Sequence, residues 1–165
     1  MLVRDHAGAV GSARPRAAST VLASRDGTRM IAGVGIDLVD IDRVQRLLDG
    51  KGQRALRRLF TADEVDYALA RALPAQHLAA RLAAKEAAFK ALAGNALAKG
   101  IGWREIEVVR GDHGPTLSLH GRASDRAAQL GVTAIWVSLT HSGTTAGAVV
   151  VLEASRASNS VSRND

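Results

Sequence analysis

The stretch ARLAAKEAAFKALAG, residues 80–94, decides the fold because it makes up most of the longest predicted helix. Alanine and leucine dominate it, as in a helix that packs inside a protein. Lys85 and Glu86 nevertheless stand side by side in its middle. On a helical wheel Lys85 lies within the apolar stripe of Leu78 and Leu82, and Glu86 lies at the border of that stripe. Burial of an unpaired charge is costly, so both side chains need partners.

Two interpretations of these charges are open from the helix alone. In the first, Lys85 extends its ammonium group to solvent and Glu86 pairs with Lys90 one helical turn later. In the second, Glu86 meets Asp37, which ends an apolar strand, over a divalent cation. Two carboxylates together with substrate phosphates are a usual way to hold Mg²⁺. Lys85 and Lys90 would then neutralise phosphate oxygens.

His141 is a further candidate because it ends the strand-like segment VSLTH, residues 137–141, where a side chain can face a cleft. A lone histidine is more often structural or exposed on the surface. A hydrolase triad built from His141 with Ser138 or Ser142 lacks the nucleophile-elbow sequence. The pair Gly33-x-Gly35 is not a dinucleotide fingerprint either, because the third glycine is absent.

Hydrophobic periodicity and turn residues predict one α+β domain. The predicted order is β-α-α-α-β-β-α-β-β, with helices packed on a mainly antiparallel sheet. The segments are a strand at 30–39, helices at 40–48, 61–73 and 75–93, strands at 104–110 and 116–121, a helix at 122–130, and strands at 133–141 and 146–153. Thr61 and Glu64 form a capping box that opens the second helix, and Pro74 is expected to end it.

The composition limits the function classes. The chain has 165 residues and a net charge of +6, of which residues 1–29 carry +3 and residues 154–165 carry +1. We therefore expect a disordered basic extension at 1–29, a folded domain at 30–153 and a disordered tail at 154–165. Since aromatic residues make up only 3%, nucleic-acid binding is a weak alternative that rests on the charged extension.

Cysteine is absent from the sequence, which excludes disulfides and a thiol nucleophile. The lack of cysteine fits a cytoplasmic location. No apolar run approaches the roughly 20 residues that span a membrane. We therefore expect neither a nucleic-acid partner nor a membrane partner.

Three segments in register resemble holo-acyl-carrier-protein synthase, the 4′-phosphopantetheinyl transferase of the fatty-acid synthase type. They are GVGIDLVDIDRV (33–44), ARLAAKEAAFKAL (80–92) and VSLTHSGTTAGAVVVLE (137–153). The resemblance covers roughly residues 30–153. It implies a 4′-phosphopantetheinyl transferase-like fold and transfer of the phosphopantetheine arm of coenzyme A to a serine of an apo acyl carrier protein. Adenosine 3′,5′-bisphosphate would be released, in fatty-acid or polyketide biosynthesis.

The resemblance also assigns roles to residues. Asp37 and Glu86 would bind Mg²⁺ with the coenzyme A diphosphate, Lys90 would lie near the phosphates and His141 near the reacting centre. Lys85 is a second candidate for the phosphates, and His113 and Pro115 are candidates for the adenine end of coenzyme A. The family is typically a homotrimer with active sites at subunit interfaces.

The resemblance implies an acidic partner, the acyl carrier protein. Arg43, Arg46 and Arg54 would dock it, although a solvated helix face would show the same charges. The sequence departs from the family after Lys90, where residues 91–102 replace the usual A-F-G-T-G. This departure leaves open an alternative, a coenzyme A-binding module of the same fold without transfer activity.

Overall fold

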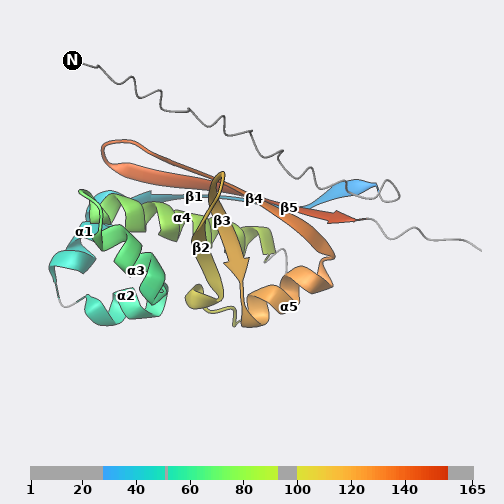
Figure 1. Cartoon of the computed structure of the whole chain (residues 1–165), viewed down its shortest axis with the longest axis horizontal. Helices are drawn as coiled ribbons and strands as arrows, with labels where there is room; N and C mark the ends of the chain where they lie inside the picture. The colour runs from blue at the N-terminus through green and yellow to red at the C-terminus, as the bar shows by residue number, and fades with distance from the viewer. Residues whose placement is uncertain (1–27, 51, 93–99, 156–165) are drawn as a thin grey trace, which may run out of the picture.

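The computed structural model describes residues 28–50, 52–92 and 100–155 of the chain. Two sheets and five α-helices make up this part (Figure 1). In chain order the elements are β1 (Arg29–Asp40), α1 (Ile41–Asp49), α2 (Gln53–Leu59), α3 (Ala62–Leu69), α4 (Pro74–Leu92), the 3₁₀ turn η2 (Trp103–Glu105), β2 (Ile106–Gly111), β3 (Gly114–Leu119), α5 (Gly121–Gln129), β4 (Val132–His141) and β5 (Thr145–Ser155). The predicted α+β class is confirmed.

The larger sheet brings the two ends of the domain together. Its strand order is β1-β5-β4 and both pairings are antiparallel, while β2 and β3 form a separate hairpin. Asp37 on β1 pairs with Ala148 of β5, and His141 on β4 pairs with Ala146. Because these partners are two residues apart on β5, Asp37 and His141 lie near the same end of the sheet, on the same face.

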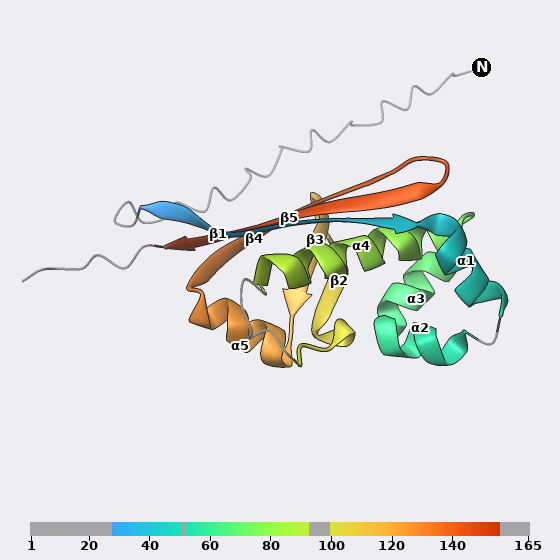
Figure 2. The same ribbon diagram turned by 180° about the vertical axis from the view of Figure 1, so that it is seen from behind.

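Helix α4 lies along one face of this sheet, and the two views agree on this placement (Figures 1 and 2). Two glycines of β1 allow the close approach. A Cβ at Gly35 would collide with the carbonyl oxygen of Ala87, and one at Gly33 with that of Ala91. The buried alanines of α4 therefore have a structural reason, since small side chains bring its backbone onto the sheet.

Some predicted boundaries were wrong. Helix α3 ends at Leu69, and Pro74 begins α4 instead of ending the helix before it. Proline is favoured at the first position of a helix, where its missing N–H costs nothing. The short helix α2 was not predicted, because its arginine-rich sequence has no sustained apolar period and buries only Leu56. The capping box of Thr61 and Glu64 is confirmed.

The predicted terminal extensions lie largely outside the described residues. Strand β1 begins at Arg29, and residues 1–27 are not described. Strand β5 continues to Ser155, two residues beyond the predicted end of the last strand, and residues 156–165 are not described. Within the described ranges, no helix combines the length and apolar character needed to cross a bilayer.

Candidate active site

Asp37, Glu86 and Lys90 meet where the end of β1 crosses α4. Lys90 donates to Asp37 Oδ1 over 2.5 Å and to the carbonyl oxygen of Ile36 over 3.0 Å. The first of the two interpretations paired Lys90 with Glu86 one turn earlier, whereas the structure has Lys90 linking the helix to the strand. Asp37 is nearly buried, whereas the Lys90 side chain is half exposed. A ligand can reach the ammonium group from solvent.

The two carboxylates face each other. Burial raises the pKa of Glu86, and the neighbouring Asp37 raises it further through its charge and a hydrogen bond to the protonated form. Arg43 and Lys90 oppose this rise with their positive charge. Asp37 Oδ2 is buried and, in the part of the chain that the structure describes, has no hydrogen-bond partner when Glu86 is ionised. Lys90 contacts the other oxygen of Asp37, so this buried oxygen is left without a positive partner among the described residues.

A divalent cation fits this arrangement. It would bind the orphaned Asp37 Oδ2 and offset the repulsion between Asp37 and Glu86. The described residues contain no cluster of three or more acidic, histidine or cysteine side chains suited to a metal. The protein would thus supply two carboxylates and leave the other positions to water and phosphate oxygens, as Mg²⁺ sites commonly do.

Lys85 does not belong to this site, which corrects the prediction that it contacts phosphate. Its side chain is 0% exposed, and its Nζ lies 2.6 Å from Glu64 Oε2. The same nitrogen donates to the carbonyl oxygens of Trp103 and Ile106, at 3.0 and 2.7 Å. These three partners use all three ammonium hydrogens. Lys85 therefore joins α4 to α3 and β2 inside the core and has no donor left for a ligand.

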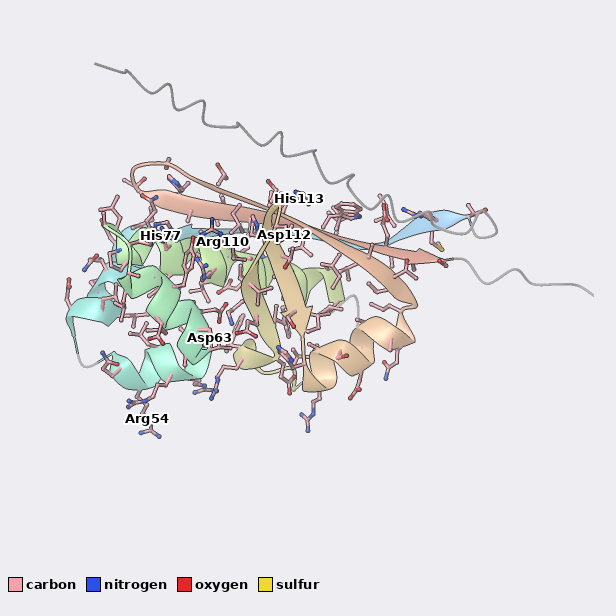
Figure 3. The ribbon with its side chains drawn as sticks, viewed as in Figure 1. Arg54, Asp63, His77, Arg110, Asp112 and His113 are labelled. Atoms are coloured by element: carbon pink, nitrogen blue, oxygen red, sulfur yellow. The ribbon has the colours of Figure 1, made fainter. Side chains whose placement is uncertain are left out.

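A cavity of about 540 Å³ opens between α3, the first half of α4, the β2–β3 hairpin and the end of β4. Its lining includes three arginines and two histidines: Arg71, Arg81, Arg110, His77 and His141. Figure 3 labels His77 and Arg110 among the side chains in this region. The cavity therefore offers several cationic groups to an anionic ligand.

Arg81 is the most buried of these cations, at 7% exposure. It donates to the carbonyl oxygen of His77 over 3.3 Å, and its Nε has no hydrogen-bond partner among the described residues. Burial lowers the pKa of Arg81, while Tyr67 raises it again. The pKa of His77 is lowered by burial and then by Arg81 and Arg71. His77 is therefore neutral near pH 7, and the arginines carry the positive charge.

The other predicted ligand residues separate into two groups. His141 and Pro115 both line the cavity, and a nitrogen of His141 lies 3.0 Å from the side-chain nitrogen of Gln76. His113 does not line it. It occupies the turn of the β2–β3 hairpin with Asp112, as labelled in Figure 3. The altered segment after Lys90 lies mostly outside the described residues, at 93–99.

The predicted docking arginines lie on the first two helices. Arg43 and Arg46 are exposed on α1, and Arg54 is exposed on α2. Figure 3 shows Arg54 pointing away from the body of the domain. Arg43 is close enough to Glu86 to lower its pKa, so this end of the basic surface adjoins the carboxylate pair.

Sequence reasoning missed Tyr67, Arg71, Arg81 and Arg110. Arg81 carried a usable signal, because it precedes Lys85 by four residues and so lies on the same side of the apolar helix. Of these two cations, Lys85 is enclosed in the core by an ion pair, whereas Arg81 lines the cavity. Tyr67, Arg71 and Arg110 carried no comparable signal, because the pocket depends on how α3 and the β2–β3 hairpin pack.

Known proteins resemble this chain in sequence. The family model described as the 4′-phosphopantetheinyl transferase superfamily matches residues 33–149. The holo-[acyl-carrier-protein] synthase of Geobacter sulfurreducens is 46% identical over 125 residues, which are 75% of this chain and 98% of that protein.

Solved structures resemble the chain as well. The acyl carrier protein synthase of Mycobacterium tuberculosis has a TM-score of 0.60 and 42% identity, covering 76% of this chain and 99% of that one. A holo-(acyl-carrier-protein) synthase of Bacillus anthracis, in complex with CoA (3′,5′-ADP), has a TM-score of 0.60 and 31% identity over 76% of this chain and 98% of that one. The chain therefore belongs to the 4′-phosphopantetheinyl transferase superfamily.

Proposed function

We propose that the protein transfers the 4′-phosphopantetheine group of coenzyme A to a serine of an apo acyl carrier protein, in fatty-acid biosynthesis. The observation that carries the proposal is the pairing of Asp37 and Glu86 beside Lys90, next to a cavity lined by arginines. Coenzyme A has two anionic regions, a diphosphate and a 3′-phosphate on its ribose. Asp37 and Glu86 beside Lys90 supply a site for one of these regions, and the cavity supplies a site for the other.

The positions of the two sites along α4 determine how coenzyme A would be oriented. Arg81 and Glu86 are five residues apart on α4, which is about 7.5 Å along the helix axis at 1.5 Å per residue. We assign the diphosphate to Asp37, Glu86 and Lys90, and the phosphoadenosine end to the cavity with Arg81, Pro115 and His141. His113, on the neighbouring turn, would contact this end only from outside the cavity.

Mg²⁺ is the divalent cation that we propose for Asp37 and Glu86, where it would stabilise negative charge on the diphosphate. The serine oxygen of the carrier forms a bond to the phosphorus that bears pantetheine. The bond from that phosphorus to the bridging oxygen breaks, adenosine 3′,5′-bisphosphate leaves, and the serine proton is released. Lys90 holds a phosphate oxygen, and His141 positions the ligand at the end of β4.

The carrier protein would dock on the basic surface of α1 and α2. Arg43, Arg46 and Arg54 are exposed there, and Arg43 lies near Glu86. Acyl carrier proteins are acidic, so this surface would steer association and lose that effect at high salt. Charge reversal at Arg46 should raise the KM for the carrier and leave the KM for coenzyme A unchanged.

We propose that the working form is a homotrimer with active sites at subunit interfaces. One face of the β1-β5-β4 sheet supports this assembly, because α4 covers only the other face. Large apolar side chains on the uncovered face are 38–70% exposed: Val34, Ile36, Leu38, Trp136 and Val149. A contiguous apolar patch of this kind marks an interface. The number three comes from the family resemblance.

The transfer assay tests the function directly. Apo acyl carrier protein is incubated with coenzyme A, Mg²⁺ and the full chain, and its intact mass is recorded. We expect the mass of one phosphopantetheine group to be added. Binding of coenzyme A by calorimetry without any mass gain, for every carrier protein tried, would instead identify a binding module without transfer activity. We also propose that the protein acts in the cytoplasm, where coenzyme A and apo carrier protein meet.

A further inference from the structure

Tyr67 belongs to none of the sequence motifs described above. It nevertheless contacts two arginines of the cavity, Arg71 and Arg81. It lies on α3, half-buried, and its ring lines the cavity wall. The guanidinium carbon of Arg81 lies over this ring, 4.0 Å from its centroid. That of Arg71 lies 4.6 Å from the same centroid. One aromatic ring thus makes cation–π contacts with two guanidinium groups.

The ring has an electrostatic effect on this arrangement. The two guanidinium groups repel each other, and Arg71 accordingly lowers the pKa of Arg81. The negative face of an aromatic ring attracts both groups and so reduces the cost of holding them together without a bound anion. His77 packs edge-on against the ring, with 6.0 Å between centroids, and limits its movement.

The two arginines retain donors for a ligand. Arg81 uses Nη1 for the carbonyl oxygen of His77 and also hydrogen-bonds the Tyr67 side chain, while its buried Nε has no hydrogen-bond partner within the described ranges. A phosphate monoester carries close to two negative charges near neutral pH and three acceptor oxygens. It therefore matches a pair of guanidinium groups better than a diphosphate oxygen with a single charge does.

We propose that Tyr67 is a positioning residue that holds Arg71 and Arg81 together as a clamp for the 3′-phosphate of coenzyme A. This inference rests on the proposed function, and it adds the origin of a preference for coenzyme A over 3′-dephospho-coenzyme A. Tyr67 itself makes no contact with the reacting atoms. Its effect falls mainly on the affinity for ligands that carry the 3′-phosphate.

Two substitutions separate the ring from the hydroxyl. Tyr67→Phe keeps the aromatic face, and Tyr67→Leu removes it while filling similar space. For each variant and the wild type, kcat and KM are measured with coenzyme A and with 3′-dephospho-coenzyme A. We expect Tyr67→Leu to raise the KM for coenzyme A roughly tenfold. The rise in KM should be at least severalfold smaller for the dephosphorylated substrate, and Tyr67→Phe should retain most of the preference for the 3′-phosphate.

Several results would overturn the inference. They are an equal loss with both substrates, no loss with either, or a wild-type enzyme with no preference for the 3′-phosphate. Calorimetric titration with adenosine 3′,5′-bisphosphate and with 5′-AMP keeps this test independent of turnover. If the wild type transfers no phosphopantetheine, the proposed function fails. The titrations then still decide whether Tyr67→Leu weakens the bisphosphate alone, as we expect, or both nucleotides equally, which would refute the clamp.

Discussion

Lys85 and Glu64 form a fully enclosed ion pair, with 2.6 Å between Nζ and Oε2 and side chains 0% and 1% exposed. Glu64 also accepts hydrogen bonds from the backbone N–H groups of Thr61 and Val108. The pair therefore links the start of α3, the middle of α4 and strand β2. Glu86 is the next residue on α4, so the pair fixes the part of the helix that carries it.

Removing one member of this pair should be far more damaging than removing both. Lys85→Met leaves the Glu64 charge buried without its partner, so we expect the free energy of unfolding to fall by about 3–5 kcal/mol. The double variant Lys85→Met with Glu64→Leu should recover a large part of that loss. Urea denaturation of the single and double variants measures both effects. A loss below about 1 kcal/mol for Lys85→Met would contradict this account.

Gly35 should tolerate no side chain. A Cβ there would collide with the carbonyl oxygen of Ala87, so Gly35→Ala has to push β1 away from α4. We expect a destabilisation of about 1–3 kcal/mol from this overpacking. The affinity for the proposed Mg²⁺ should fall as well, because Asp37 lies two residues further along the displaced strand.

Gly143→Ala is the matched control, since a Cβ at Gly143 meets nothing within 4 Å. Its free energy of unfolding should differ little from that of the wild type. Thermal or urea unfolding of the two variants in parallel makes the comparison. Equal stability of the two variants would contradict the prediction, because it would show that a Cβ at Gly35 fits between β1 and α4.

Glu107 should make the stability depend on acid. A hydrogen bond from Thr61 lowers the pKa of Glu107, and His120 lowers it further. A carboxylate with a lowered folded-state pKa stabilises the protein above its unfolded pKa of about 4.5, and that stability disappears as the pH falls through the folded value. Glu107→Gln should flatten the pH dependence of the unfolding free energy in that acidic range. An unchanged slope in the variant would contradict the assignment.

The uncovered sheet face should control assembly. Ile36→Glu places a charge in the apolar patch, and we expect it to convert the proposed homotrimer into monomers in sedimentation experiments. Leu69→Glu is the control, because Leu69 is similarly exposed but lies on α3, away from this face. A monomeric wild type, or a trimer that persists in Ile36→Glu, would contradict the proposed interface.

The sequence predicted the parts of the molecule that depend on local patterns. The alanine-rich helix, the capping box at Thr61 and the final hairpin of β4 and β5 follow from periodicity and turn chemistry, and the structure confirms them. The burial of the Lys85 ammonium group was not predicted, because both interpretations placed it at the surface, either in solvent or on a phosphate. Its partner was missed as well, because the sequence gives Glu64 a role as a helix-capping residue.

What could not be predicted depends on contacts between distant segments. The cavity joins α3, α4, the β2–β3 hairpin and the end of β4, so no window of sequence contains its arginines together. The ion pair of Lys90 has the same origin. A helical wheel shows only Glu86 as a neighbouring carboxylate, whereas the packing of β1 on α4 places Asp37 beside Lys90 although the two are more than fifty residues apart in sequence.

The most direct test of the central claim is the intact mass of an apo acyl carrier protein after incubation with coenzyme A and Mg²⁺. The wild-type chain should convert it to the phosphopantetheine-bearing form, and chelation of the metal should stop the reaction. Glu86→Gln, checked for an unchanged fold by circular dichroism, should slow the transfer by at least roughly 100-fold, because one of the two proposed metal ligands loses its charge. No mass gain with the wild type, or an equal rate with Glu86→Gln, would contradict the account.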